Sequence, residues 1–159
     1  MTRRVKTERF SLLLAGLAGG LLLGIPASSG AEATIGPAQI RITDREIASK
    51  RIDIGPRGRS AGDMDVMRHL LYNRRVTTQS ICHVEVLCTF IVGNSRNCRG
   101  VYFLPKGKLV VGGSIIYPQF YELAILGGTG LYDNARGTLT VTRTARNPNR
   151  SIVFFRLVG

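Results

Sequence analysis

Three cysteines in the middle of the chain are the residues whose spacing most directly suggests chemistry. Cys88 and Cys98 flank a turn-rich stretch, residues 93–97, between two β-like runs. A hairpin there would place the two cysteines opposite each other, so we predict a disulfide between them, with Cys82 left over. Closing this short loop would stabilise the fold by about 3 kcal/mol. A zinc site that added His83 to the cysteines has the wrong ligand spacing, and we expect no metal.

A glycine cluster near the C-terminus, Gly127-Gly128-Thr129-Gly130, resembles a phosphate-binding loop only superficially. It lacks the Lys-Ser/Thr pair and the long following helix of such loops, so we interpret it as a structural turn. Two other kinds of catalytic site are also disfavoured. The sequence has no nucleophile elbow of a serine hydrolase, and its two histidines accompany no acidic cluster of a metalloenzyme.

Short runs of β-branched and aromatic residues, separated by turn residues, make up most of the chain after residue 37. We expect strands at residues 38–43, 62–71, 77–92, 98–104, 108–116, 119–126, 135–145 and 151–158, with one helical turn at 131–134. The pattern predicts an all-β domain, an eight-stranded antiparallel up-and-down β-barrel. An immunoglobulin-like sandwich is the alternative, but the chain has no Trp and its cysteines are too close in sequence.

The first 33 residues have the character of a signal peptide. Four basic residues precede an uncharged run at residues 10–25, and small residues follow, so that cleavage after Ala31 or Ala33 fits. A retained membrane anchor is the alternative, although the run is shorter than the roughly 20 residues that span a bilayer. We therefore expect residues 1–33 to be removed, and residues 34–159 to form one exported domain, secreted or periplasmic.

The chain is strongly basic, with a formal net charge of +12. Such a charge suits an anionic partner. Its basic residues are scattered over expected turns and strand ends, however, and aromatic residues do not alternate with them as in proteins that bind single-stranded nucleic acid. We do not expect nucleic acid as the partner, and a generally basic surface is the simpler interpretation.

The C-terminal third resembles the dirigent proteins. The glycine cluster is followed by Ala135-Arg136-Gly137 and, later, by the final run Phe154-Phe155-Arg156-Leu157, in the order of the dirigent signature. Allene oxide cyclases share a similar glycine turn. Residues 58–62 resemble the Gly-Arg-Ala-x-Gly motif that precedes the second strand of the dirigent family. Residues 104–113 resemble bacterial allene-oxide-cyclase-like members, which also tend to carry a cysteine pair that matches Cys88 and Cys98. Together the resemblance covers about residues 53–158.

This resemblance implies an eight-stranded barrel with an apolar central pocket, often trimeric in plants, that works without a cofactor. Dirigent proteins steer the coupling of phenoxyl radicals or quinone methides, and allene oxide cyclases direct the cyclisation of a fatty-acid epoxide. Both act mainly by confining a reactive molecule in one conformation. For this chain the resemblance implies a small apolar or aromatic ligand, held inside the barrel.

Arg136 corresponds to the arginine of the dirigent Ala-Arg-Gly motif, which points into the pocket there. We expect it to be the main polar group of the pocket, with Thr138 and Thr140 on the same face. It either stabilises an oxygen of the ligand or forms a structural salt bridge with Asp63, Asp133 or Glu85.

Each of the other candidate site residues has two possible roles. Asp133 stands two residues later than the dirigent acid, so it either reaches the barrel mouth or caps the turn at 131–134. Glu85 resembles the pocket acid of allene oxide cyclases if its face of the strand is internal, and is solvated if that face is external. Tyr102 and Tyr121 supply pocket hydroxyls or simple packing.

Two functions therefore remain open. In the first, the barrel binds a small ligand and steers its reaction or sequesters it, as a cofactor-free isomerase, cyclase or coupling-directing protein. In the second, it is a non-catalytic scaffold whose basic surface binds an anionic envelope partner. A cavity of a few hundred Å³ would favour the first function, and a filled interior would favour the second.

Overall fold

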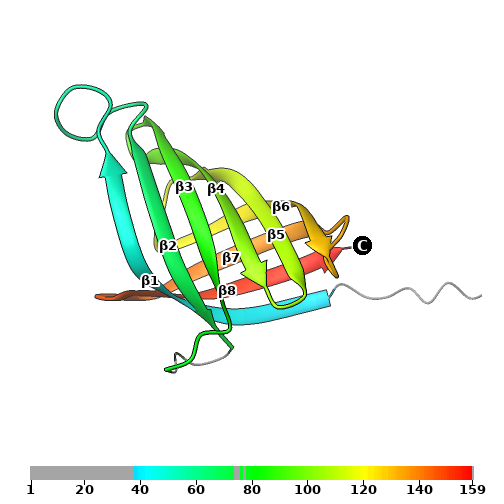
Figure 1. Ribbon diagram of the computed structural model, residues 1–159. Helices are drawn as coiled ribbons and strands as arrows, with labels where there is room; N and C mark the ends of the chain where they lie inside the picture. The colour runs from blue at the N-terminus through cyan, green and yellow to red at the C-terminus, as the bar shows by residue number, and fades with distance from the viewer. Residues whose placement is uncertain (1–37, 74–75, 77, 159) are drawn as a thin grey trace, which may run out of the picture. The chain divides into compact units, whose positions relative to one another are not determined.

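The computed structural model describes residues 38–73, 76 and 78–158, so the predicted leader lies outside the described residues. The described chain forms eight antiparallel strands that close into a barrel in sequential order (Figure 1). This confirms the predicted barrel and excludes the sandwich. The strands are β1 (Ala38–Ile52), β2 (Met64–Tyr72), β3 (Cys82–Val92), β4 (Ser95–Leu104), β5 (Gly107–Ile115), β6 (Phe120–Gly130), β7 (Arg136–Arg146) and β8 (Asn149–Val158).

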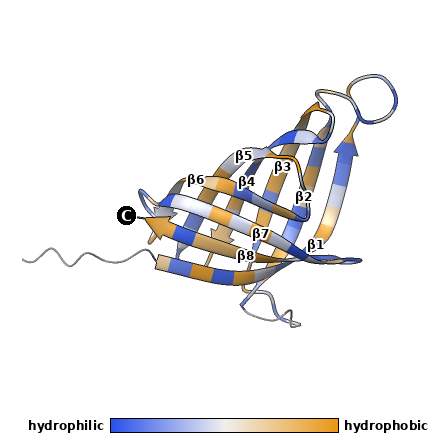
Figure 2. Cartoon of the chain, turned by 180° about the vertical axis from the view of Figure 1, so that it is seen from behind, coloured by the Kyte–Doolittle hydropathy of each residue, from blue (hydrophilic) through white to orange (hydrophobic). Residues whose placement is uncertain are grey.

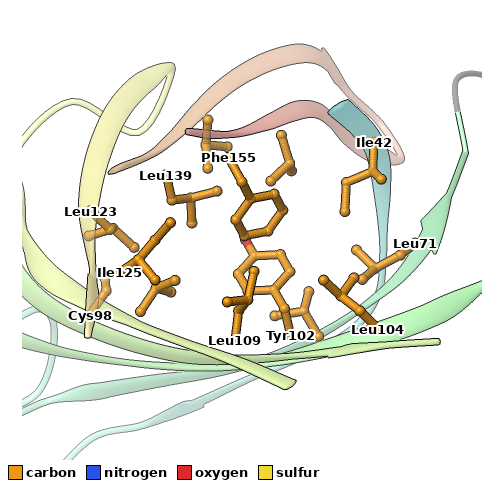
Figure 3. Packing of buried hydrophobic residues seen from close by; sticks show 14 of the residues in the cluster. Ile42, Leu71, Cys98, Tyr102, Leu104, Leu109, Leu123, Ile125, Leu139 and Phe155 are labelled. Carbon is orange, nitrogen blue, oxygen red and sulfur yellow. The ribbon is translucent and has the colours of Figure 1, made fainter. Parts of the chain in front are cut away.

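Buried residues alternate with more exposed ones along strands such as β7 and β8, so that each strand turns one face to the interior. The hydropathy colouring shows apolar and polar bands along the strands (Figure 2). Apolar residues from all eight strands fill the middle of the interior (Figure 3). At its centre the rings of Tyr102 and Phe155 meet edge to face, with centroids 5.0 Å apart. Burying these side chains supplies most of the stability of the fold.

The two ends of the barrel differ. At the Tyr132 end, the β6–β7 turn packs Tyr132 and Ala135 against the apolar core. The opposite end, here called the Phe90 end, carries the long loop between β1 and β2 and the tight β3–β4 hairpin (Figure 1). Cys88 and Cys98 lie opposite each other in that hairpin and form the predicted disulfide, with Cys82 free.

Strand β1 is much longer than predicted. Its second half pairs with β2 alone, since its pairing with β8 ends at Arg45, and a bulge interrupts the register between Glu46 and Ala48. Most side chains after the bulge are exposed, so the sequence there is polar and looks like a loop. The bulge also turns Arg51 to face Asp65 of β2, with which it pairs.

Candidate functional site

Polar side chains gather inside the barrel, in the half nearer the Phe90 end (the Phe90 half), where they surround a cavity of about 40 Å³. This volume is enough for a few water molecules. The expectation of an apolar cavity of a few hundred Å³ is therefore wrong for this structure, because the centre of the barrel is filled by side chains. By this measure the interior favours the scaffold function, so the case for a ligand site depends on the polar groups around the small cavity. The polar residues that line the cavity are Asp44, Glu46, His69, Arg96, Tyr102, Tyr121, Arg143, Asn149 and Ser151.

Asp44 and His69 form the most buried polar pair of the cavity. The Asp44 residue is 4 % exposed, and its Oδ2 lies 3.2 Å from Nδ1 of His69. The two atoms are close but poorly aligned, and neither His69 Nδ1 nor Asp44 Oδ1 has a hydrogen-bond partner among the described residues. A buried carboxylate oxygen without a partner lowers stability, so its presence calls for an explanation beyond folding.

Strand register explains why polar groups meet at this level of the barrel. Asp44 follows Ile40 and Ile42 on the inward face of β1 and stands opposite Ser151 of β8. Ser151 in turn stands opposite Arg143 of β7. The three neighbouring strands thus present a carboxylate, a hydroxyl and a guanidinium side by side to the cavity.

Two tyrosines bring phenol groups to the same cavity. Burial, with a smaller contribution from the nearby Asp44 carboxylate, raises the pKa of Tyr121 to about 12. Burial likewise raises the pKa of Tyr102 well above its ordinary value, and the Tyr121 and Asp44 side chains add to this effect. Both hydroxyls therefore stay protonated at neutral pH and can donate hydrogen bonds. The expectation that Tyr102 and Tyr121 face the interior is confirmed.

The structure places Arg136, Thr138 and Thr140 on the outer face of β7, so the predicted polar stripe on the interior wall is wrong. Leu139 and Val141, which alternate with them, are the buried residues of this strand. The Arg136 guanidinium donates from Nη1 to the carbonyl of Ala135 at 2.9 Å, and Thr140 Oγ1 donates to Glu122 Oε1 at 3.2 Å. The predicted alternation along β7 is correct, but the residues expected on the inner face lie on the outer one.

Glu85 and Asp133 also lie outside the barrel. The Glu85 side chain is 56 % exposed and 3.9 Å from both Arg68 and His83, which fits the external alternative. Asp133 is exposed in the β6–β7 turn, where its Oδ1 accepts a hydrogen bond from the Asn134 amide. The structure therefore brings neither predicted acid to the cavity.

Asp63, predicted to bind ligand or to pair with Arg136, instead anchors the β1–β2 loop. Its fully buried carboxylate accepts hydrogen bonds from the amides of Ile54 and Ser60, at 3.0 and 2.8 Å, and from Ser60 Oγ at 3.1 Å. These bonds, led by the Ser60 amide, lower the pKa of Asp63 below its ordinary value. The salt-bridge partner proposed for Arg136 is thus engaged elsewhere.

The glycine cluster is the last part of strand β6 at the Tyr132 end, paired with β5 and away from the cavity. A side chain at Gly128 would collide with the carbonyl oxygens of Tyr132 and Lys108, and Gly130 has a φ of +64°. Thr129 Oγ1 accepts a hydrogen bond from the Lys108 amide at 3.2 Å. The expectation of a turn at these residues is therefore wrong, because the cluster continues β6 and the turn follows at residues 131–134, but the contacts of the cluster are structural, as expected.

Sequence reasoning missed Asp44, His69, Arg143 and Ser151. Asp44 lies in the run Thr43-Asp44-Arg45-Glu46, which looks like a solvated segment because all four of its residues are charged or bear a hydroxyl. The available signal was the alternation of Ile40, Ile42 and Asp44, which puts the carboxylate on the apolar face.

Within the described ranges, no group of three His, Cys, Asp or Glu side chains is placed to hold a metal ion. Among the same residues, no helix is long and apolar enough to cross a membrane.

Solved structures with the same fold include three proteins whose names refer to reactions of small molecules. A pyocyanin demethylase superposes with a TM-score of 0.66 at 23 % identity, over 76 % of this chain and 100 % of its own. The Diels-Alderase AbmU from Streptomyces koyangensis gives 0.61 at 16 % identity, over 77 % of this chain and 64 % of its own. A pterocarpan synthase dirigent protein gives 0.55 at 15 % identity, over 76 % and 82 %.

The fold is thus the barrel of dirigent proteins, as the sequence resemblance implied. No protein-family model matches the sequence, and no curated protein matches it.

Proposed function

We propose that this barrel binds a small organic molecule in the Phe90 half of its interior and steers an intramolecular rearrangement of it, an isomerisation or ring closure. One observation carries the proposal: the buried Asp44–His69 pair, with unpartnered atoms on both residues, faces a cavity inside an otherwise apolar barrel. Groups with such unmet hydrogen-bonding capacity in a cavity are candidates for acid–base catalysis.

The side chains around the cavity suit proton transfer within one bound molecule. The Asp44 carboxylate accepts a proton from an acidic C–H or O–H of the ligand. A phenol of Tyr102 or Tyr121 donates a hydrogen bond to the ligand oxygen on which negative charge develops. Protonated Asp44 then returns the proton to a different ligand atom, so the product is an isomer and no other reactant is required.

The molecule would enter at the Phe90 end. Glu46, Pro118, Arg143 and Asn149 line the cavity there and are half-buried, whereas the apolar residues deeper in the barrel are buried. Because the cavity is only about 40 Å³, ligand binding requires these partly exposed side chains to move outward. Exclusion of water behind the ligand would then strengthen its interactions with Asp44 and the phenols.

The structural neighbours support small-molecule chemistry, including ring closure, inside a barrel of this fold. The same barrel is used by a cyclase that catalyses a [4+2] cycloaddition and by a pterocarpan synthase dirigent protein. The predicted export of the domain is a further part of the proposal, and the Cys88–Cys98 disulfide supports it because such bonds persist in oxidising compartments.

The exchange of carbon-bound protons tests the acid–base role without knowledge of the natural substrate. The probe is 2-tetralone, a neutral bicyclic ketone, and loss of its acidic α-proton signal in D₂O is followed by NMR. We expect wild-type protein to accelerate the exchange and Asp44→Asn to reduce that acceleration by about 100-fold. The control is Glu122→Gln, which removes an outer-face carboxylate.

Two results would contradict the proposal. If the probe does not bind inside the barrel, the binding site is wrong. If it binds there and exchanges equally fast with wild type and Asp44→Asn, the role of Asp44 is wrong.

A further inference from the structure

Three arginines surround one buried ring at the Phe90 end of the barrel. The guanidinium carbons of Arg51, Arg59 and Arg96 lie 5.5, 4.7 and 5.7 Å from the centroid of Phe90, which is 3 % exposed. These three residues are called the arginine cluster below. Stacking on an aromatic face leaves the N–H edges of a guanidinium free to donate hydrogen bonds.

The cluster has more positive charge than its acidic neighbours neutralise. Asp65 is shared, with Oδ1 3.1 Å from Arg51 Nε and Oδ2 3.4 Å from Arg96 Nη1. Within the described chain no carboxylate pairs with Arg59, and the positive charges of Arg59 and Arg143 act unfavourably on Arg96. One carboxylate therefore pairs with two of the three guanidiniums, and Arg59 has none among the described residues.

The remaining carboxylates nearby are engaged elsewhere. Asp63 accepts hydrogen bonds within the β1–β2 loop, and Asp53 in the same loop accepts one from the Gly58 amide at 3.3 Å. Asp44 faces His69, and Glu46 accepts a bond from Asn149 at 2.7 Å. None of them is paired with a member of the arginine cluster.

Burial makes this imbalance costly. The Arg96 side chain is 16 % exposed, and it lines the same cavity as Asp44 and Tyr121. An arginine cannot lose its proton to relieve the cost. Arg96 has only a share of Asp65, and the exposed Arg59 has no carboxylate partner among the described residues, so an added anion between the two would balance the charge.

The loop that carries Arg59 is held in place over the ring. Gly62 donates a backbone hydrogen bond to the Phe90 carbonyl at 2.9 Å, and the Phe90 amide donates to the Asp63 carbonyl at 2.8 Å. The buried Asp63 carboxylate fixes the loop further through Ser60, the residue that follows Arg59. The position of Arg59 is thus determined by the fold rather than by an ion pair.

We infer that the arginine cluster is an anion subsite at the cavity mouth, and that the ligand of the barrel is an organic carboxylate. Its carboxylate would lie between Arg59 and Arg96, which offer planar N–H edges suited to two oxygens. Its apolar body would extend past Phe90 into the cavity, toward Asp44. This inference rests on the proposed function, since it names the ligand class of the same site.

A matched pair of probes distinguishes the anion subsite from ligand binding in the cavity as such. 1-Naphthoate and 1-naphthamide have the same ring system and similar shape, but only the first is charged. Their affinities for the whole protein are measured by NMR titration, following the amides of Phe90 and Gly62. We expect the carboxylate to bind about tenfold more tightly than the amide, the worth of a charged hydrogen bond.

Variants on the same loop provide the control. Arg59→Gln should remove most of the preference for naphthoate and leave naphthamide binding unchanged. Arg57→Gln, two residues earlier and also exposed, should leave the preference intact. Arg59→Lys keeps the charge without the planar edge and should give an intermediate preference.

The failures of the two proposals are distinguishable. Equal affinities for both probes, or equal loss of preference in Arg59→Gln and Arg57→Gln, would overturn the anion subsite while leaving the cavity proposal standing. If neither probe perturbs the Phe90 end, both proposals are overturned.

Discussion

Asp44 Oδ2 and His69 Nδ1 lie 3.2 Å apart inside the barrel, on adjacent strands, without forming an aligned hydrogen bond. Their closest register neighbours are Leu71, opposite Asp44, and Glu46, opposite His69. Unpartnered polar atoms buried in this way lower the stability of a fold, and functional sites commonly carry such a cost.

Replacing Asp44 should therefore not destabilise the barrel. We expect Asp44→Leu to leave the free energy of unfolding unchanged or to raise it by about 1 kcal/mol, because the unpartnered oxygen is removed. Urea unfolding followed by circular dichroism measures the change. Ile42→Ala on the same face of the same strand is the control and should cost about 2–5 kcal/mol. A loss of several kcal/mol in Asp44→Leu would show instead that the carboxylate is structural.

The disulfide should make a large contribution to stability. It links residues 10 apart in sequence, at the centre of the β3–β4 hairpin. On the chain-entropy model, the double variant Cys88→Ala/Cys98→Ala should lose about 3 kcal/mol. Calorimetry with the Cys82→Ala variant as control measures this loss, and equal melting temperatures for the two variants would refute it.

Asp63 should give the barrel an acid-sensitive loop. Its pKa is lowered in the folded state by amide hydrogen bonds, so the carboxylate stabilises the fold above the unfolded-state pKa of about 4. This contribution is lost as the pH falls through the lower, folded-state value. The stability difference between wild type and Asp63→Asn should accordingly be constant near neutral pH and shrink below about pH 4. A difference that does not change between pH 6 and pH 3 would contradict this account.

Arg136 should be dispensable, contrary to the expectation from its motif. Its guanidinium is on the outer face and donates to the carbonyl of the preceding residue. Arg136→Leu is expected to change the free energy of unfolding by no more than about 0.5 kcal/mol and to leave probe binding in the cavity unchanged. Thermal melts and a 2-tetralone titration check both parts, and a clear loss in either would restore Arg136 to the site.

Gly137, the residue that follows Arg136 in the Ala-Arg-Gly motif, is required by the backbone of the barrel. Gly137 has a φ of +132°, and a side chain there would collide with the Arg156 carbonyl of β8. The sequence resemblance thus located a backbone requirement of the barrel, and the adjacent arginine merely shares its strand.

Strand periodicity was sufficient to predict the barrel and its hairpin disulfide, because both follow from local alternation and turn residues. It was not sufficient for the site. Alternation along β7 assigns Arg136 and Leu139 to opposite faces, but which face is internal depends on closure of the whole barrel. Asp44 and His69 are 25 positions apart in sequence and meet only through the β1–β2 register, which contains an unforeseen bulge.

The central claim is that a small organic molecule binds inside the barrel, and methyl NMR tests it most directly. Titration with 2-tetralone should shift the methyl signals of the buried cavity residues Val84, Val111 and Leu123. Val86→Phe, which fills the cavity, should abolish these shifts, whereas Leu87→Phe on the outer face should preserve them. Shifts confined to the exposed methyls of Val66, Leu87 and Leu126, or persisting in Val86→Phe, would contradict the claim and place the ligand on the barrel surface.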